Sequence, residues 1–168
     1  MRSRTSTWFE TKVRYQKTMD DGAEKKVTEA YVVDALSFTE AESSIIDEMS
    51  VYTSGELQVT GISKATYGEI FFSDVDDDDK WYRAKLSFIT IDEKTEKEKR
   101  SVVNYLVQAK SMARALRYID EVMGQTMIDY EVVGLLETKL MDVFEHTAPS
   151  EKKEEKNDKP EYEQQSAE

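Results

Sequence analysis

Two stretches of the chain share one pattern of apolar and polar positions. Residues 31–49 and residues 105–123 each read as a strand that runs directly into a helix. Matching residues recur between the two stretches at an offset of 74, namely Tyr31 and Tyr105, Val33 and Val107, Ala35 and Ala109, Ala41 and Ala115, Ile45 and Ile119, and Met49 and Met123. Self-similarity at a fixed spacing indicates an internal repeat of one structural unit.

The first copy begins with a strand over residues 8–16, in which apolar and polar side chains alternate. A turn that contains Gly22 leads into a second strand over residues 26–35. A third strand is expected over residues 56–63, where Gly61 indicates a bulge or a close backbone approach. With the helix, the copy has the order strand, strand, helix, strand.

The helix of each copy has a clear start. Ser37 and Glu40 have the capping-box spacing, in which each side chain satisfies a free backbone N–H of the first turn. Ser111 stands at the matching place in the second copy, and Gly124 is well placed to end that helix. Apolar residues at three- and four-residue steps predict one stripe on each helix, which would pack on a sheet.

These elements predict an α+β fold of two tandem β-β-α-β repeats, related by an approximate internal two-fold, with the helices packed on antiparallel sheet. A single copy would expose one face of a small sheet, so we expect the two copies to share a core. The expected segments are a flexible N-terminus over residues 1–7, a first repeat over 8–72, a solvated acidic linker over 73–80, a second repeat over 81–146, and a disordered charged tail over 147–168.

The charge and the composition limit the function. Thirty-five acidic against 23 basic side chains give a net charge of −12. So acidic a protein does not bind duplex nucleic acid by bulk electrostatics, and an anion-binding site would have to be a local basic patch. The chain has no cysteine, no apolar run that could cross a bilayer and no apolar segment near its N-terminus. We therefore expect a cytoplasmic protein without disulfides and without a membrane partner.

The sequence offers no convincing catalytic, metal or cofactor site. Asp74, Asp76 and Asp78 have the alternate spacing of a calcium loop, but the glycine and the bidentate glutamate of that loop are absent. His146 is the only histidine, and we expect it on the surface. The single glycines form no phosphate-binding loop. We expect no enzyme and no cofactor, although acid–base chemistry by two carboxylates stays open.

The remaining candidate is the non-core face of the first strand in each copy. Each face presents one tryptophan and two cations, which are Trp8, Lys12 and Arg14 in the first copy and Trp81, Arg83 and Lys85 in the second. A tryptophan can stack on a base while the cations hold a phosphate. The alternative is that each tryptophan closes the far side of the sheet under the other repeat or a partner subunit, with the cations solvated.

The chain also resembles a family of small proteins of unknown function, found in gut Bacteroidales bacteria and in their phages and mobile elements. The resemblance is carried by residues 8–15, 27–42, 70–72, 88–93 and 141–144, and it covers about residues 7–144. It implies no catalytic residues. It favours phage-type roles, such as binding DNA during replication, sequestering a host signal or neutralising a host factor.

Two functional hypotheses follow. The first is a non-catalytic binding protein for a nucleotide-containing or single-stranded nucleic-acid ligand, which the paired tryptophan–cation faces would hold. The second is an acidic protein-interaction module that sequesters or inhibits a host defence factor, with steep salt dependence toward a basic partner. The two helices carry opposite charges, with Lys110, Arg114 and Arg117 on the second. Attraction between these surfaces of two copies is a further hypothesis and would give a homo-oligomer.

Overall fold

The computed structural model describes residues 1–53 and 55–146, so the expected tail over residues 147–168 lies outside the described residues. The described residues form two helices and nine strands. In chain order these are β1 (Arg2–Arg4), β2 (Trp8–Thr18), β3 (Glu24–Asp34), α1 (Phe38–Met49), β4 (Gln58–Ala65), β5 (Tyr67–Phe72), β6 (Lys80–Ile91), β7 (Glu98–Ala109), α2 (Met112–Met123), β8 (Asp129–Glu137) and β9 (Leu140–Phe144).

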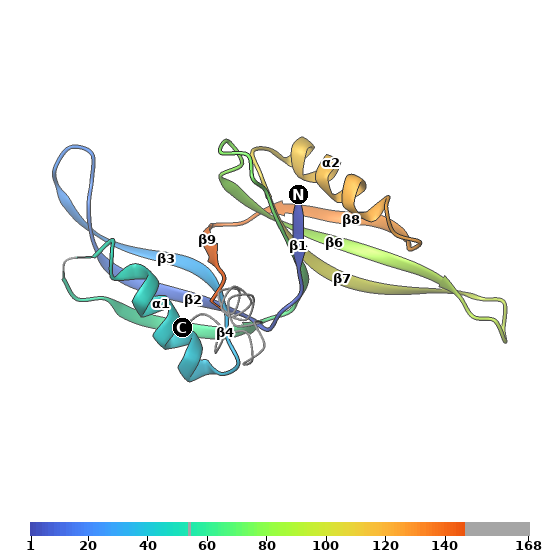
Figure 1. Cartoon of the computed structure of the whole chain (residues 1–168), viewed down its shortest axis with the longest axis horizontal. Coiled ribbons are helices and arrows are strands. Elements are labelled where there is room, and N and C mark those ends of the chain that lie inside the picture. The colour runs from blue at the N-terminus through green and yellow to red at the C-terminus, as the bar shows by residue number, and fades with distance from the viewer. Residues whose placement is uncertain (54, 147–168) are drawn as a thin grey trace, which may run out of the picture.

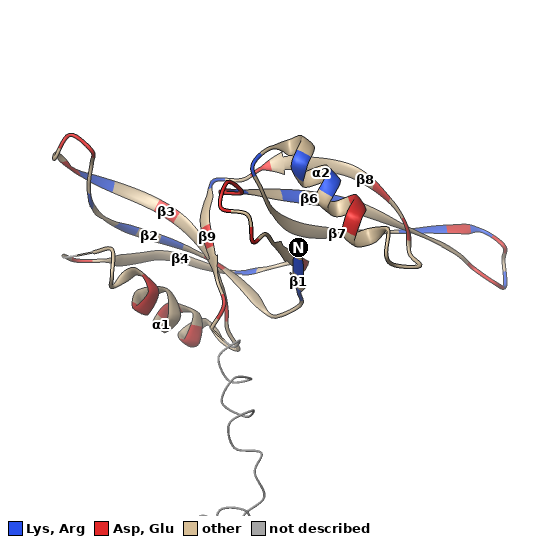
Figure 2. Cartoon of the chain, turned by 45° about the horizontal axis from the view of Figure 1, so that its top comes forward, with Lys and Arg blue, Asp and Glu red and all other residues tan. Residues whose placement is uncertain are grey.

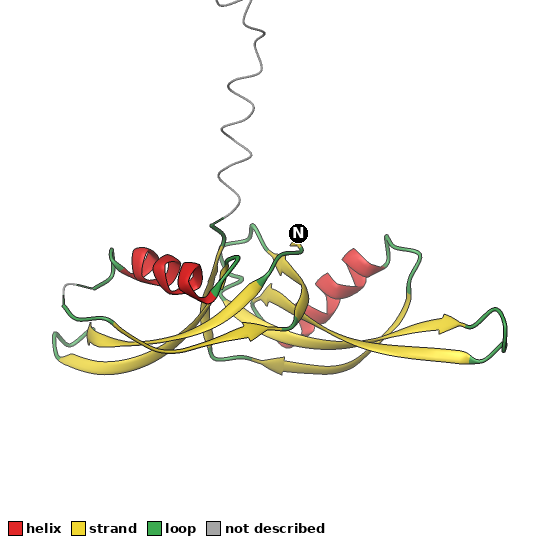
Figure 3. Cartoon of the chain, turned by 90° about the horizontal axis from the view of Figure 1, so that it is seen from below, coloured by secondary structure: helices red, strands yellow, loops and turns green. Residues whose placement is uncertain are grey.

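The strands form two sheets, and each sheet carries one helix. The first sheet has the strand order β4-β2-β3-β9 and the second has the order β1-β5-β7-β6-β8 (Figure 1). Helix α1 packs on the first sheet and α2 on the second, and Figure 3 shows both helices on the same side of the strands. The mixed α+β class is therefore confirmed, as is the order strand, strand, helix, strand in each half.

The last strand of each half crosses to the sheet of the other half. Strand β5 pairs in parallel with β7, and β9 pairs in parallel with β3. The two crossings match, because Ile70 pairs with Leu106 and Val143 pairs with Val32. The expected β-β-α-β unit on purely antiparallel sheet is thus corrected to a unit with a fourth strand and one parallel pairing. Apolar periodicity marks a strand but carries no information about its partner.

The sheets share a matched bulge. In the first sheet Lys12 pairs with Gly61 and Val13 pairs with Val59, which leaves one extra residue in β4. In the second sheet the same shift follows the pairing of Lys85 with Gly134. The bulge predicted at Gly61 is confirmed, and it recurs at the equivalent place.

The helix starts are as the sequence predicts. The Ser37 Oγ accepts a hydrogen bond from the Glu40 N–H at 3.1 Å, and the Ser111 Oγ accepts one from the Arg114 N–H at 3.2 Å. The Glu40 carboxylate accepts from the N–H of Leu36, one residue before the expected partner. Neither helix in the described part of the chain is long and apolar enough to span a membrane.

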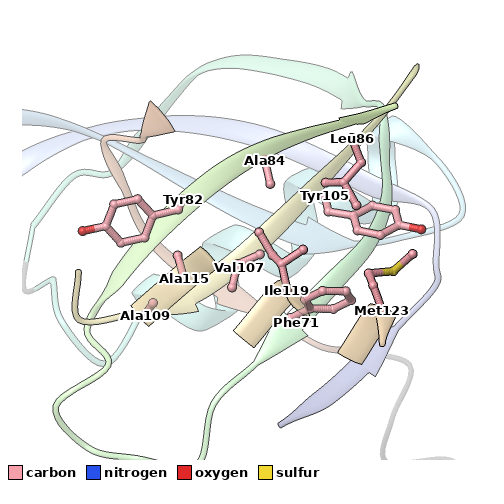
Figure 4. Packing of buried hydrophobic residues seen from close by; sticks show 10 residues of the cluster. All are labelled: Phe71, Tyr82, Ala84, Leu86, Tyr105, Val107, Ala109, Ala115, Ile119 and Met123. Carbon is pink, nitrogen blue, oxygen red and sulfur yellow. The ribbon is translucent and has the colours of Figure 1, made fainter. Parts of the chain in front are cut away.

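Three apolar clusters hold the fold together. Ile45 of α1 and Ile119 of α2 are both 0% exposed, and each lies at the centre of the cluster between its helix and its sheet (Figure 4 shows the second). The third cluster joins the halves through residues on the sheet faces that the helices leave uncovered. Its buried members are Trp8, Val32, Tyr67, Ile70, Phe72, Trp81, Leu106 and Val143. The expected shared core is this third cluster.

The N-terminus is ordered by ion pairs, contrary to the flexible segment expected over residues 1–7. Strand β1 pairs with β5 at the edge of the second sheet. Arg4 lies 2.8 Å from the buried carboxylate of Asp34, and Arg2 lies 2.7 Å from Glu145. The carboxylates that hold the two arginines are 30 and more residues away, so no local pattern could predict the strand.

His146 lies at the surface with its side chain 26% exposed, and it is held by two contacts. Its backbone N–H donates to the Asp34 carboxylate, and its Nε2 lies 3.1 Å from Glu48. The contact ties the end of β9 to the end of β3 and to α1.

The acidic linker is not uniformly solvated. Asp78 is 2% exposed and accepts hydrogen bonds from the Ser73 hydroxyl, the Lys110 N–H, the Tyr118 hydroxyl and Arg114, whereas the other linker aspartates are exposed. Burial alone would raise the pKa of Asp78, but these donors together lower it below its ordinary value. Asp78 therefore fixes the linker to α2. Among the described residues, no group of three acidic or histidine side chains is placed to hold a metal ion.

Candidate functional site

The two tryptophans of the predicted ligand faces are buried. Trp8 is 1% exposed and Trp81 is 2% exposed. Phe72 lies beside both, with ring centroids 6.4 Å from Trp8 and 5.7 Å from Trp81. Neither ring is available to stack on a base, so the predicted stacking role is corrected. Alternation places both tryptophans on the face away from the helix, but the strands that cross between the halves cover that face. This arrangement is the alternative that the sequence left open.

The four cations of these faces are exposed, but they lie on two different sheets. Lys12 and Arg14 belong to β2, and Arg83 and Lys85 belong to β6. The structure thus brings the tryptophans together in the core and leaves the cations outside it. The predicted set does not form one ligand site.

A different site lies on the helix side of the first sheet, near the outer end of β2 and β3. It is a pocket of about 410 Å³, open to solvent, which we call the tyrosine–carboxylate pocket. It is lined by Tyr15, Gln16, Lys17, Thr18, Glu29, Tyr31, Tyr52, Met141, Asp142 and Phe144. Strands β2, β3 and β9 supply the walls, and Tyr52 comes from the loop after α1.

Glu29 is the centre of the hydrogen bonding in this pocket. The Tyr15 hydroxyl donates to the Glu29 carboxylate, and the Lys17 Nζ lies 3.6 Å from the same carboxylate. Burial and this hydrogen bond raise the pKa of Tyr15, so its hydroxyl stays protonated and keeps donating. Burial followed by the Glu29 charge raises the pKa of Tyr31 to about 12. The Tyr31 ring stacks on Phe144 with centroids 5.4 Å apart.

Asp142 is the second carboxylate of the pocket. Desolvation raises the pKa of Asp142 although solvent still reaches the side chain, and the charge of Glu48 adds to the effect. The Val143 N–H donates to the carboxylate at 2.8 Å and acts in the opposite direction. Ionisation of Asp142 therefore costs more free energy than usual, and a positive charge beside the carboxylate would lower that free energy.

The pocket has the chemistry of a site for an organic cation. Its lining holds two carboxylates, one lysine and three tyrosines. Cations are attracted to carboxylates and to the faces of aromatic rings, and partial desolvation strengthens both attractions. A concave site with a few polar groups and perturbed pKa values is also the usual form of a binding site.

The equivalent place in the second half has a more apolar lining. There Phe88 occupies the position of Tyr15, and Val103 occupies the position of Glu29. The Tyr105 ring, which matches Tyr31, packs on Phe71 and Phe88 at centroid distances of 5.4 and 6.1 Å (Figure 4 shows Tyr105 and Phe71). Glu69 keeps a carboxylate at the position of Asp142. Because the same scaffold folds with apolar residues at the other two positions, Tyr15 and Glu29 are not required for folding.

Sequence reasoning missed this site, although one signal was available. Glu29 falls on the core face of its strand, because it pairs with the buried Val13. A carboxylate at such a position costs free energy unless it has partners. Comparing the two repeats residue by residue, with Val103 against Glu29, would have found it.

The comparisons with known proteins agree with the expectation of an uncharacterised family. No curated protein and no solved structure matches the chain. One family does match, over residues 7–146, which is almost the whole described length and close to the extent of the resemblance. The chain therefore belongs to the family described as Domain of unknown function (DUF4494).

Proposed function

We propose that the protein is a non-catalytic binding protein whose tyrosine–carboxylate pocket holds a positively charged side chain of a partner protein. The observation that carries this proposal is the difference between the two halves. At equivalent places the second half has Phe88 and Val103, while the first has Tyr15 and Glu29 at an open pocket; the other carboxylate, Asp142, has a counterpart in Glu69. Selection for stability alone would favour the apolar form, because a well-packed apolar core is the more stable arrangement.

The surroundings of the pocket favour a basic partner. Helix α1, which lies beside the pocket on the same side of the sheet, carries acidic side chains and no lysine or arginine (Figure 2). The whole chain has a net charge of −12. Complementary charge of this kind speeds encounter with a basic protein and disfavours acidic ones.

This proposal develops the protein-interaction hypothesis. The hypothesis of base stacking by Trp8 and Trp81 loses its support with their burial. If the family occurs in phages and mobile elements, as the sequence resemblance implies, the partner is a cytoplasmic host protein and the binding sequesters or inhibits it. That setting is part of the proposal.

The direct test is an NMR titration with N-acetyl amides of arginine, lysine and norleucine. We expect the two cationic probes to shift the backbone signals of the pocket residues, such as Glu29 and Asp142, in a saturable way. Norleucine amide, which has a similar stem and no charge, should leave them unchanged. Equal shifts from all three probes, or no saturable shift from any, would contradict the proposal.

A double variant that copies the second half provides the matched comparison. Tyr15→Phe with Glu29→Val should weaken arginine amide binding at least about tenfold, because one carboxylate and its donor are lost. Glu121→Gln, an exposed residue of α2, changes the net charge by the same amount and should leave binding within about twofold.

The pH dependence gives a second readout. The raised pKa of Asp142 means that the carboxylate is protonated at a higher pH than usual. Affinity for the cationic probes should therefore be full above that pKa and fall as the pH drops through it. Asp142→Asn should remove this part of the pH dependence. An unchanged profile in Asp142→Asn would show that Asp142 does not contact the probe.

A further inference from the structure

The opposite face of the same sheet carries a cluster of cations without carboxylate partners. Lys12 and Arg14 of β2 and Lys26 of β3 are exposed on the face away from α1. Within the described part of the chain, none of the three lies within 4.0 Å of a carboxylate oxygen in an ion pair. Three neighbouring cations, none of them in such an ion pair, are unexpected on a protein with a net charge of −12.

The strand register shows how close these groups are. Arg14 pairs directly with Gln58 on one side, and Lys26 pairs directly with Gln16. Arg14 and Lys26 are then diagonal neighbours, which long side chains can bridge. The four side chains line a hollow of about 350 Å³, which Tyr15, Gly55 and Glu56 also line. Its charged and amide groups are two cations, two amides and one carboxylate.

The matching positions of the second half show how such a cation is paired there. Arg100 stands where the first half has Lys26, and Glu131 stands where it has Gln58. In that half the Arg100 Nη1 lies 2.8 Å from Glu131, and its Nε lies 3.6 Å from Glu98. The first half has Gln58 in place of the closer carboxylate, while Glu24 stands at the position of Glu98 and forms no ion pair with Lys26 within 4.0 Å.

We infer that this outer face of the first sheet is a binding site for a small phosphate-bearing molecule, held by Arg14 and Lys26 with Gln16 and Gln58 as neutral donors. Arginine presents paired N–H groups that match phosphate oxygens, and lysine adds a point charge. Lys12, two positions along the same face, extends the positive surface toward the centre of the sheet. The site is small and local, so it suits a compact anion better than a nucleic-acid duplex.

This inference does not rest on the proposed function. The charged groups of the two sites lie on opposite faces of one sheet, because Arg14 and Lys26 point away from α1 while Glu29 lies on the side of α1. The two pockets share only Tyr15 and Gln16 in their linings. Cationic amides test the carboxylates and phosphates test the cations, so either proposal can fail while the other stands.

The test is a titration with inorganic pyrophosphate at constant ionic strength, followed by backbone NMR. We expect saturable shifts confined to neighbouring parts of β2, β3 and β4, around Arg14, Lys26 and Gln58. Gln58→Glu, which installs the carboxylate of the second half, should weaken pyrophosphate binding about tenfold or more. Gln58 is exposed, so this variant should fold like the native chain.

The control variant changes the net charge equally at another place. Lys25→Ala also makes the chain more negative by one charge, but Lys25 faces the other side of β3, paired with Lys17. It should change pyrophosphate binding less than about twofold. Equal losses in Gln58→Glu and Lys25→Ala would reveal nonspecific attraction, and absence of saturable shifts in the native chain would remove the site. Either result overturns the inference.

Discussion

The two halves of the molecule have one backbone plan and two different sets of polar residues. The long hairpin, the helix, the bulge and the crossing strand occupy matched positions in both. On the helix side the first half has Tyr15 and Glu29 where the second has Phe88 and Val103. On the outer side the first half has a cation beside Gln58, where the second has an ion pair with Glu131. The second half shows that the backbone folds with apolar residues and an ion pair at these positions. The polar residues of the first half are therefore not needed for this backbone.

The halves also differ where each crossing strand ends. The Ser73 N–H donates to the Gln108 side chain, and the His146 N–H donates to Asp34 at the equivalent place. The carboxylate of Asp34 also holds Arg4 of β1, which a neutral glutamine could not do as well. Asp34 therefore helps to hold the N-terminal strand, together with Glu145.

The largest expected effect tests whether the halves are equivalent in their cores. Ile45→Ala and Ile119→Ala should each lower the free energy of unfolding by about 2–5 kcal/mol, because both side chains are completely buried and leave a cavity. Exposed Lys12→Ala should cost less than about 0.5 kcal/mol. Denaturant titration of the three variants measures this. If the isoleucine variants unfold like Lys12→Ala, the model of two matched cores is wrong.

A smaller effect belongs to the second half alone. Asp78→Ala should lower the free energy of unfolding by about 1–3 kcal/mol, since it leaves buried donors such as the Tyr118 hydroxyl without their acceptor. Asp76→Ala, in the same linker but exposed, should have almost no effect.

The pH dependence of the Asp78 effect follows from its lowered pKa. The contribution of Asp78 is complete above the pKa of an unfolded aspartate, about 3.9, and is lost as the pH falls through the lower folded value. The difference in stability between the native chain and Asp78→Ala should therefore shrink in acid. A difference that stays constant from pH 7 to pH 2 would contradict the assigned role.

The smallest effects concern the glycines. A Cβ at Gly61 or Gly134 would meet only ordinary contacts, at 3.9 and 3.5 Å from Lys12 and Lys85, so both alanine variants should stay within about 1 kcal/mol of the native chain. Gly68 differs, because a Cβ there would lie 3.1 Å from the Tyr105 ring. Thermal unfolding should rank Gly68→Ala as the least stable of the three. Equal melting temperatures would show that the Tyr105 ring moves enough to accommodate the added methyl group.

The sequence by itself determined the local elements and the repeat. Alternation in β2 and β6, the serine caps of both helices and the glycine-marked bulge depend on interactions between near neighbours, and short-range patterns report these directly. The repeat also predicted that Ile45 and Ile119 are equivalent and buried, because helical spacing identifies the face that packs on a sheet.

Only the tertiary structure decided which surfaces meet. The strand faces that carry Trp8 and Trp81 have the same alternation of residues whether they are exposed or covered. The crossing of β5 and β9 covers both faces. The same crossing places Asp142 of β9 beside Glu29 of β3, more than a hundred residues away, and so completes the pocket. Pairings over such distances depend on the summed packing of the whole chain, and no local pattern of residues encodes them.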